Sequence, residues 1–467
     1  AKGGDAGEYG AFDVIHHADS VKSAISGGVS ASVSAIGSVV ATTGSGSLTT
    51  NALVAFSSLA DRNLAAQAVP MARARGRPDL LPAPEPRDLL WRSLSLTEAQ
   101  RHLRGALVAA AVGALVFLWY VPVSFVSSLT TLSEIAKHAP WLFDIIDSSP
   151  VLEGFLEGFL PTLALVVFMA LLPTLLTALT VAEGAFSRSA VDAGLMEKLF
   201  LFNVFNVFLG SSVAGVILGS LEDLGKNLSP EAIAQLLGDT LPDVALFFTN
   251  YVMLLALSGL PLELLRIGPL VVGVAKRKLG MYKTDAERRR GDDPGQVPYG
   301  LLFPQALLVF LITVVYAVLQ PLILVFAALF FAVALIVWKH QVLYVYRVAW
   351  HAGGRAWPSV YARAVVCLVI AQTTMVGVLP TYGAAAQAAA VVPLIAITIF
   401  AYVRTQRVLG PSFDYLPVAE ARHADAGGGH AADFPAPVAD RDAVLAAIPH
   451  AFTPPSLVAR AIPSALV

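Results

Sequence analysis

Residues 241–278 read LPDVALFFTNYVMLLALSGLPLELLRIGPLVVGVAKRK, and this stretch decides the fold of the chain. It is apolar enough to cross a membrane, but a continuous helix from Asp243 to Arg277 would be about 51 Å long, against a hydrocarbon core of about 30 Å. Residues 258–261, near its middle, have the composition that bends or interrupts a helix. Glu263 follows with apolar neighbours on both sides. A broken span that carries a carboxylate is typical of an ion or substrate pathway.

The composition of the whole chain requires an apolar solvent around the fold. Hydrophobic residues make up 56% of the chain and charged residues only 14%, whereas soluble chains carry about 25% charged residues. The formal net charge of −2 indicates no class of partner. The single cysteine, Cys367, lies in an apolar segment, where we expect a small buried hydrophobe and no disulfide within the chain. We therefore predict a polytopic membrane protein.

Four regions follow from the composition along the chain. Residues 1–50 are rich in glycine and serine and are predicted to be a mostly disordered, cytosolic, low-complexity segment. Residues 51–104 hold a strand-like run, TNALVAFS, and then a connector rich in arginine and proline. Residues 105–409 carry the apolar segments. Residues 410–467, rich in alanine, proline and glycine, are predicted to be a disordered cytosolic tail.

Eight membrane-spanning helices are predicted between residues 105 and 409. Their approximate limits are 105–129, 155–183, 199–221, 241–275, 301–318, 321–346, 358–380 and 384–406. Tight turns are expected near residues 320–321 and 380–383. The loops between the spans alternate between rich and poor in lysine and arginine, which predicts that both ends of the chain are cytoplasmic.

Several polar side chains lie within the predicted spans. Asn203 and Asn206 are three residues apart and share one face of an α-helix. They suit either hydrogen bonding between packed helices or a polar strip along a pathway. Thr249, Asn250 and Tyr251 lie two turns before the predicted bend, in the same span as the carboxylate.

Glu263 has two interpretations, which the residues alone leave equal. It is either an ion-pathway carboxylate or one half of an interfacial salt bridge with Arg266 or Lys276. The bend that precedes it is expected at Gly259 and Pro261, and we treat these two residues as the hinge.

Signatures of soluble enzymes are missing from the sequence. There is no GxxxxGK[ST] loop, no HExxH, no GxSxG and no pair of cysteines. We therefore predict no enzymatic step, no cofactor and no metal site. The basic run at residues 276–290 lies beside a membrane span, so it indicates attraction to anionic lipid and topology, and we expect no nucleic-acid partner.

The ordered series of motifs resembles the OSCA family of hyperosmolality-gated, calcium-permeable channels. The motifs are LVAFSSLADRNLAAQ from residue 53, EGFLPTLALVVFMALLPTLL from 157, FNVFNVFLGSSVAG from 202, FFTNYVMLLALSGLPLELLRIGPL from 247, WKHQVLYVY from 338 and RVLGPSFDYLP from 407. The resemblance covers roughly residues 51–417. It implies an all-α polytopic membrane protein with an anoctamin-like channel domain of eight helices. It also implies a remnant of an α+β cytosolic linker domain, and three further helices that would precede this chain.

The resemblance also implies which helices line the pore. These are the spans at 105–129, 155–183, 199–221, 241–275 and 301–318. Tyr251 matches an aromatic residue that narrows the family's pore, and Glu263 matches a pore-facing carboxylate. The hinge at Gly259 and Pro261 departs from the family's more usual hinge rich in glycine and alanine, which implies a stiffer bend. Asn203 and Asn206 fall in a family motif without an assigned role.

The expected function is a mechanically or osmotically gated, non-selective cation channel permeable to calcium, potassium and sodium. The alternative is a phospholipid scramblase that uses the same helices as a lipid groove, with Asn203, Asn206 and Asn250 on its polar face. A secondary transporter would show an inverted repeat, and none is recognisable in the sequence. Membrane lipids, a homodimer and a location in the plasma membrane are the further expectations.

Overall fold

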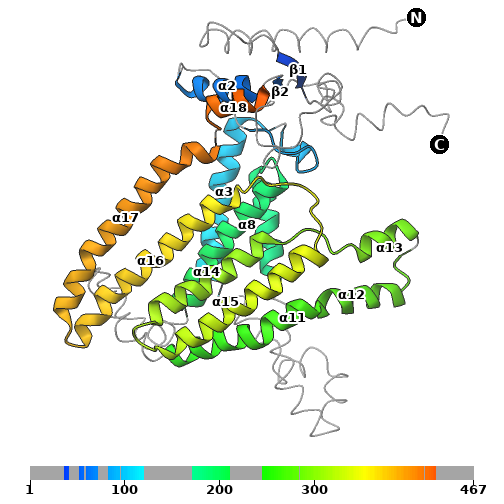
Figure 1. Ribbon diagram of the computed structural model, residues 1–467. Helices are drawn as coiled ribbons and strands as arrows, with labels where there is room; N and C mark the ends of the chain where they lie inside the picture. The colour runs from blue at the N-terminus through cyan, green and yellow to red at the C-terminus, as the bar shows by residue number, and fades with distance from the viewer. Residues whose placement is uncertain are drawn as a thin grey trace, which may run out of the picture. The chain divides into compact units, whose positions relative to one another are not determined.

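The computed structural model describes the parts of the chain that carry the predicted spans (Figure 1). The described residues are 36–41, 52–56, 59–71, 82–94, 96–119, 171–210, 244–282, 284–414 and 416–426. The chain divides into two compact units. Unit 1 comprises residues 1–103, 184–188 and 403–467, and unit 2 comprises residues 104–183 and 189–402.

Unit 1 contains a small sheet and two packed helices. Strand β1 (Ile36–Ala41) pairs antiparallel with β2 (Ala52–Phe56), and α2 (Leu59–Met71) follows. Helix α18 (Val418–Asp425) packs against α2. The strand-like run at residues 50–57 is thereby confirmed as β2.

The packing of α18 against α2 includes a helix cap. The Asp425 carboxylate accepts hydrogen bonds from the backbone amides of Leu59, at 3.0 Å, and Ala60, at 2.9 Å. These amides open α2 and have no partner within the helix. A carboxylate at a helix N-terminus satisfies them and also interacts favourably with the helix dipole.

Two of these elements lie where we predicted no order. Strand β1 is inside residues 1–50, and α18 is inside residues 410–467. Each gains its order from an element of residues 51–104, since β1 pairs with β2 and α18 packs on α2. Composition alone cannot reveal such pairing between distant segments.

Unit 2 holds helices that match six of the eight predicted spans. Among the described residues, the helices that are long and apolar enough to cross a membrane are Ala99–Leu118, Val244–Lys278, Tyr299–Tyr316, Leu322–Val345, Ala356–Thr381 and Ala385–Pro411. Their elements are α3 (Glu98–Leu118), η3 (Leu255–Gly259), α11 (Leu260–Leu265), α12 (Ile267–Lys278), α14 (Tyr299–Tyr316), α15 (Leu322–His340), η4 (Gln341–Val345), α16 (Ala356–Thr381) and α17 (Ala385–Asp414). The predicted turn at 380–383 is confirmed between α16 and α17, where Gly383 has a positive φ of 75°. The turn at 320–321 is confirmed between α14 and α15.

The second and third predicted spans are described in part. Helix Leu171–Glu183 covers the end of the second span, and residues 155–170 lie outside the described residues. Helix α8 (Arg188–Phe202) continues into η2 (Asn203–Leu209), and residues 211–221 lie outside them too. Helix α8 begins well before the predicted limit of 199, because the apolar pattern marks only its hydrophobic half.

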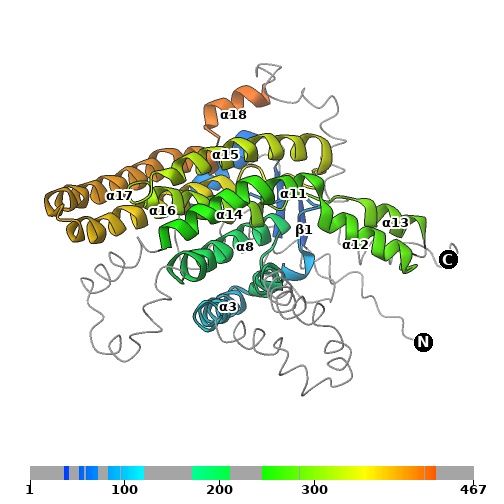
Figure 2. The ribbon, with the colours of Figure 1, turned by 90° about the horizontal axis from the view of Figure 1, so that it is seen from below.

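Helix α14 is the centre of unit 2. Its side chains are buried along most of its length, as expected for a helix that is apolar all round. It packs against α15, α16 and η2, and Figure 2 shows it between α8 on one side and the pair α15–α16 on the other. Helix α17, in contrast, presents many apolar side chains outward, as suits a helix that faces lipid chains.

Two glycines let α8 approach its neighbours closely. A Cβ atom on Gly194 would lie 2.5 Å from a methyl group of Thr180 in helix Leu171–Glu183. A Cβ on Gly300, near the start of α14, would lie 2.8 Å from the backbone oxygen of Asp192. Small residues at such crossings are the usual way in which membrane helices pack.

Candidate functional site

The fourth span contains a π-helical turn at the predicted bend. Element η3 (Leu255–Gly259) widens the helix immediately before Pro261. Proline has no amide hydrogen, and its ring collides with the carbonyl oxygen four residues earlier. A π turn moves that carbonyl away, and such turns are frequent at functional sites. The chain stays in right-handed helical conformation through Gly259 and Leu260.

The break in this span lies at Arg266, beyond the predicted hinge. Arg266 adopts a left-handed conformation, with φ 49° and ψ 41°, and separates α11 (Leu260–Leu265) from α12 (Ile267–Lys278). Gly259 is the last residue of the π turn and Pro261 lies in the first turn of α11, so both belong to a continuous helical stretch. The sequence pattern placed the irregularity correctly within the span and missed the residue at which the helix ends.

Glu263 lies half-buried beside this break and contacts Tyr346. The Tyr346 hydroxyl donates a hydrogen bond to Glu263 Oε1 at 3.1 Å, and Gln341 Nε2 donates to the Glu263 backbone oxygen at 2.9 Å. The Arg266 guanidinium lies over the Tyr346 ring, 4.9 Å from its centroid. Within the described part of the chain, neither Arg266 nor Lys276 forms an ion pair with Glu263. The interfacial salt bridge considered from the sequence is thus replaced by a hydrogen bond to a phenol.

Tyr346 immediately follows η4, at the end of the sixth span. Its side chain is half-buried, and its phenol hydroxyl is the donor to Glu263 Oε1. The sequence indicated Tyr346 only as part of the motif WKHQVLYVY, with no role attached.

The other predicted polar residues of the fourth span point in different directions. Thr249 is buried, and its hydroxyl donates to the Ala245 backbone oxygen at 2.9 Å. Asn250 is exposed, whereas Tyr251 is half-buried and packs against the core of unit 2. Consecutive residues on a helix diverge by about 100°, so these three side chains do not form one polar surface.

Asn203 and Asn206 both lie in the π-helical element η2. Both are half-buried. A π-helix has more residues per turn than an α-helix, so residues three apart diverge more in direction than the sequence pattern assumed. Element η2 packs against α14, so both asparagines belong to an element at the contact between two predicted pore helices.

An aromatic cluster joins three of the predicted pore helices. The Phe248 ring lies 5.2 Å from the Tyr316 ring and 6.1 Å from the Phe208 ring, centroid to centroid, and these three side chains are almost fully buried. They come from the fourth span, α14 and η2 respectively. Sequence analysis singled out Tyr251 one turn away and missed this cluster, because aromatic residues in an apolar helix are ordinary.

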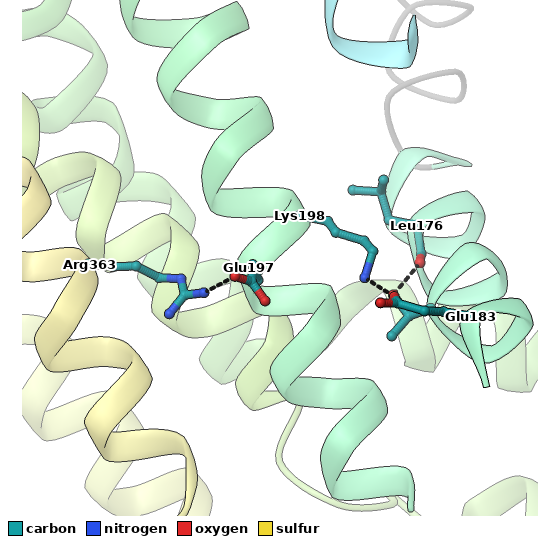
Figure 3. A network of polar contacts seen from close by, with 6 residues as sticks. Leu176, Glu183, Glu197, Lys198 and Arg363 are labelled. Atoms are coloured by element: carbon teal, nitrogen blue, oxygen red, sulfur yellow. Dashed lines mark hydrogen bonds and ion pairs between the residues drawn. The ribbon is translucent and has the colours of Figure 1, made fainter. Parts of the chain in front are cut away.

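Two ion pairs connect α8 to its neighbours (Figure 3). Lys198 Nζ lies 2.7 Å from Glu183 Oε2, and Arg363 Nη2 lies 2.9 Å from Glu197 Oε1. The basic groups are largely buried, whereas Glu197 is mostly exposed. These pairs neutralise the charges that α8 carries into the helix bundle. Within the described residues, no group of three or more His, Cys, Asp or Glu side chains gathers to hold a metal ion.

Comparison with known proteins identifies the family. The family model described as "Calcium-dependent channel, 7TM region, putative phosphate" matches residues 104–379, which is more than half of the chain. The hyperosmolality-gated Ca²⁺ permeable channel 1.7 of Arabidopsis thaliana is 35% identical over 73% of this chain and 43% of its own length. Channel 3.1 of the same plant is 37% identical over 70% and 45%, and the CSC1-like protein ERD4 of Brassica juncea is 36% identical over the same shares. The chain spans less than half the length of these relatives. It belongs to the OSCA family of calcium-permeable channels.

Proposed function

We propose that this chain forms the pore domain of a calcium-permeable, non-selective cation channel that opens under membrane tension or osmotic stress. The similar proteins from Arabidopsis thaliana are named as hyperosmolality-gated and Ca²⁺ permeable. Their shared region includes the fourth span with its carboxylate and the helices that pack around it. We propose the same activity for this chain from that region.

The observation that supports a gated pore most directly is the aromatic cluster of Phe208, Phe248 and Tyr316. It lies where three predicted pore helices meet, and it is apolar and closely packed. A narrow apolar constriction blocks ions by excluding water. Separation of these helices under tension would admit water and ions, so we assign the cluster to the closed state.

The carboxylate of Glu263 supports cation preference in this proposal. It is only half-buried, and it lies within the fourth span, three residues before the break at Arg266. A carboxylate at the mouth of a pathway raises the local concentration of cations and repels anions. Calcium, potassium and sodium are the proposed permeant ions.

The proposal includes a membrane and an assembly. We place the protein in the plasma membrane. We also place both ends of this chain in the cytoplasm, since the loops alternate in lysine and arginine content. Membrane lipids surround the exposed apolar side chains of α17 and α12. We also propose a homodimer, which mass photometry of the protein in nanodiscs would test.

Tension recordings from the protein in liposomes test the function, run beside a fluorescent-lipid flip assay on the same preparation. We expect cation current that rises with tension. Lipid flipping without tension-gated current would favour the scramblase that uses the same helices.

Replacing Glu263 with glutamine tests the carboxylate. Unitary cation conductance should fall about two- to fivefold, the effect of a single partly screened charge of about 0.5–1 kcal/mol. The matched control is Asp285→Asn, which removes a charge from an exposed side chain of α13 (Asp285–Asp292). Equal conductance in both variants and the wild type would remove Glu263 from the ion pathway.

A further inference from the structure

The fourth span breaks at a residue that is poorly suited to the break. Arg266 is the one non-glycine residue with positive φ among the described residues. A side chain with a Cβ is disfavoured in this conformation, whereas glycine adopts it freely. Gly268 lies two residues further on and stays within the regular helix α12. The chain thus breaks at an arginine although a glycine is near, so contacts of the arginine must hold the break.

Side-chain contacts hold both Arg266 and Glu263, which lies three residues before it. The Arg266 guanidinium lies 4.9 Å from the centroid of the Tyr346 ring, and its Nη2 donates to the Pro294 backbone oxygen at 3.5 Å. The Tyr346 hydroxyl donates to Glu263 Oε1 at 3.1 Å, and Gln341 Nε2 donates to the Glu263 backbone oxygen at 2.9 Å. We call Glu263, Arg266, Gln341 and Tyr346 the latch.

The segments that hold Pro294 and Tyr346 are joined to each other by further hydrogen bonds, and we call these two segments the frame. The Arg347 amide donates to the Gly295 backbone oxygen at 3.0 Å, and Gln296 Nε2 donates to the Trp350 backbone oxygen at 3.3 Å. These bonds tie the segment before α14 to the segment after η4. These hydrogen bonds involve no residue of the fourth span.

The segment between the two irregularities is one short helix. Helix α11 is short, and it is bounded by the π turn η3 on one side and by Arg266 on the other. Each irregularity has a regular alternative. The π turn can return to an α-helical turn, and Arg266 can return to the right-handed region, where its backbone strain is lost. A broken, latched arrangement and a continuous, released one are the two discrete states.

We propose that the latch holds the fourth span in its broken arrangement and thereby sets the tension at which the channel opens. Arg266, Gln341 and Tyr346 are positioning residues in this role, since they act through the fourth span and touch no permeant ion. The proposal rests on the proposed channel function, and it adds the residues that determine the threshold. Bilayer tension would act against the three side-chain contacts of the latch.

The latch and the ion-attracting role of Glu263 require different properties of that side chain. Ion attraction requires its charge, whereas the latch requires an oxygen that accepts the hydrogen bond from Tyr346. Glu263→Gln keeps the acceptor and removes the charge. It should lower conductance while it changes the tension threshold less than Tyr346→Phe does.

Tyr346→Phe removes one hydroxyl and keeps the ring beneath Arg266. At a fixed tension below the wild-type midpoint, we expect the ratio of open to closed channels to rise about tenfold or more, the effect of one lost hydrogen bond to a charged acceptor. Unitary conductance should stay unchanged. The matched control is Tyr344→Phe, because the Tyr344 ring is exposed and lies against His340. The control should behave as the wild type.

Two substitutions of Arg266 separate its side-chain contacts from its backbone conformation. Arg266→Gly loses the contacts but adopts the left-handed conformation freely. Arg266→Ala loses the same contacts and keeps the steric penalty. The tension midpoint should therefore be highest in the wild type, lower in Arg266→Gly and lowest in Arg266→Ala. Equal midpoints in the two variants, or a change in conductance without a change in midpoint, would overturn the latch.

A spectroscopic distance tests the latch without any current. Spin labels at exposed Val274 on α12 and exposed Val348, in a Cys367→Ala background, should give one narrow distance distribution in the latched protein. Tyr346→Phe and Arg266→Ala should broaden or shift it, and Tyr344→Phe should not. Unchanged distances in all variants would refute the latch even if tension-gated current is found. Absence of current in the wild type, with shifted distances in the variants, would refute the channel function and leave the latch supported.

Discussion

Replacing Phe248 with alanine should make the channel open at lower tension. Phe248 is fully buried between Phe208 of η2 and Tyr316 of α14. Alanine removes the ring that both neighbours contact, while the fourth span keeps its helical backbone. If this packing exists only in the closed state, its loss favours the open state.

The magnitude follows from the two ring contacts that cross between helices. An aromatic pair contributes about 0.5–1.5 kcal/mol beyond the burial of area. Exposure of the ring to water in the open state would add to this contribution, so the two ring pairs give a lower bound. Two pairs therefore correspond to about 1–3 kcal/mol, or a shift of about 5- to 150-fold in the ratio of open to closed channels.

Tension–response curves from liposome patches measure this shift. Phe247→Ala is the matched control, because Phe247 contacts the Phe248 ring at 5.2 Å but is itself about half exposed. Its curve should lie close to that of the wild type. A Phe248→Ala curve that coincides with the Phe247→Ala curve would refute the assignment of this cluster to the closed state.

Two further predictions concern stability. Gly300→Ala should lower the free energy of unfolding by about 1–3 kcal/mol, because its Cβ would lie 2.8 Å from the Asp192 backbone oxygen. Thermal unfolding in nanodiscs measures this loss. Gly273 has open space around it, so Gly273→Ala should show no loss. Asp425→Asn should weaken the cap of α2 by up to about 1 kcal/mol, since an amide oxygen replaces a carboxylate at the helix N-terminus. Hydrogen exchange of the first amides of α2 should accelerate in this variant and remain unchanged in the control Glu420→Gln. Equal exchange rates in the two variants would contradict the role of Asp425 as the cap of α2.

The sequence by itself located the six spans that the structure describes as long apolar helices, and its resemblance indicated the family. A membrane helix satisfies its backbone hydrogen bonds within its own segment, so length and apolar composition suffice to locate it. The turns at 320–321 and 380–383 were predicted for the same reason, because proline and glycine act locally. The β2 strand was visible as a short run of β-branched and apolar residues.

Only the tertiary structure decided where polar groups point and where the fourth span breaks. Asn203 and Asn206 lie inside the π-helical element η2, and Thr249 is buried while the neighbouring Asn250 is exposed, so these residues could be located along the chain but not oriented. The break lies at Arg266, which has a left-handed backbone and whose guanidinium lies over the ring of Tyr346, a residue that follows η4. A local pattern favours glycine or proline at a break. Contacts from distant segments override that preference, because several side-chain interactions together outweigh the strain of one residue.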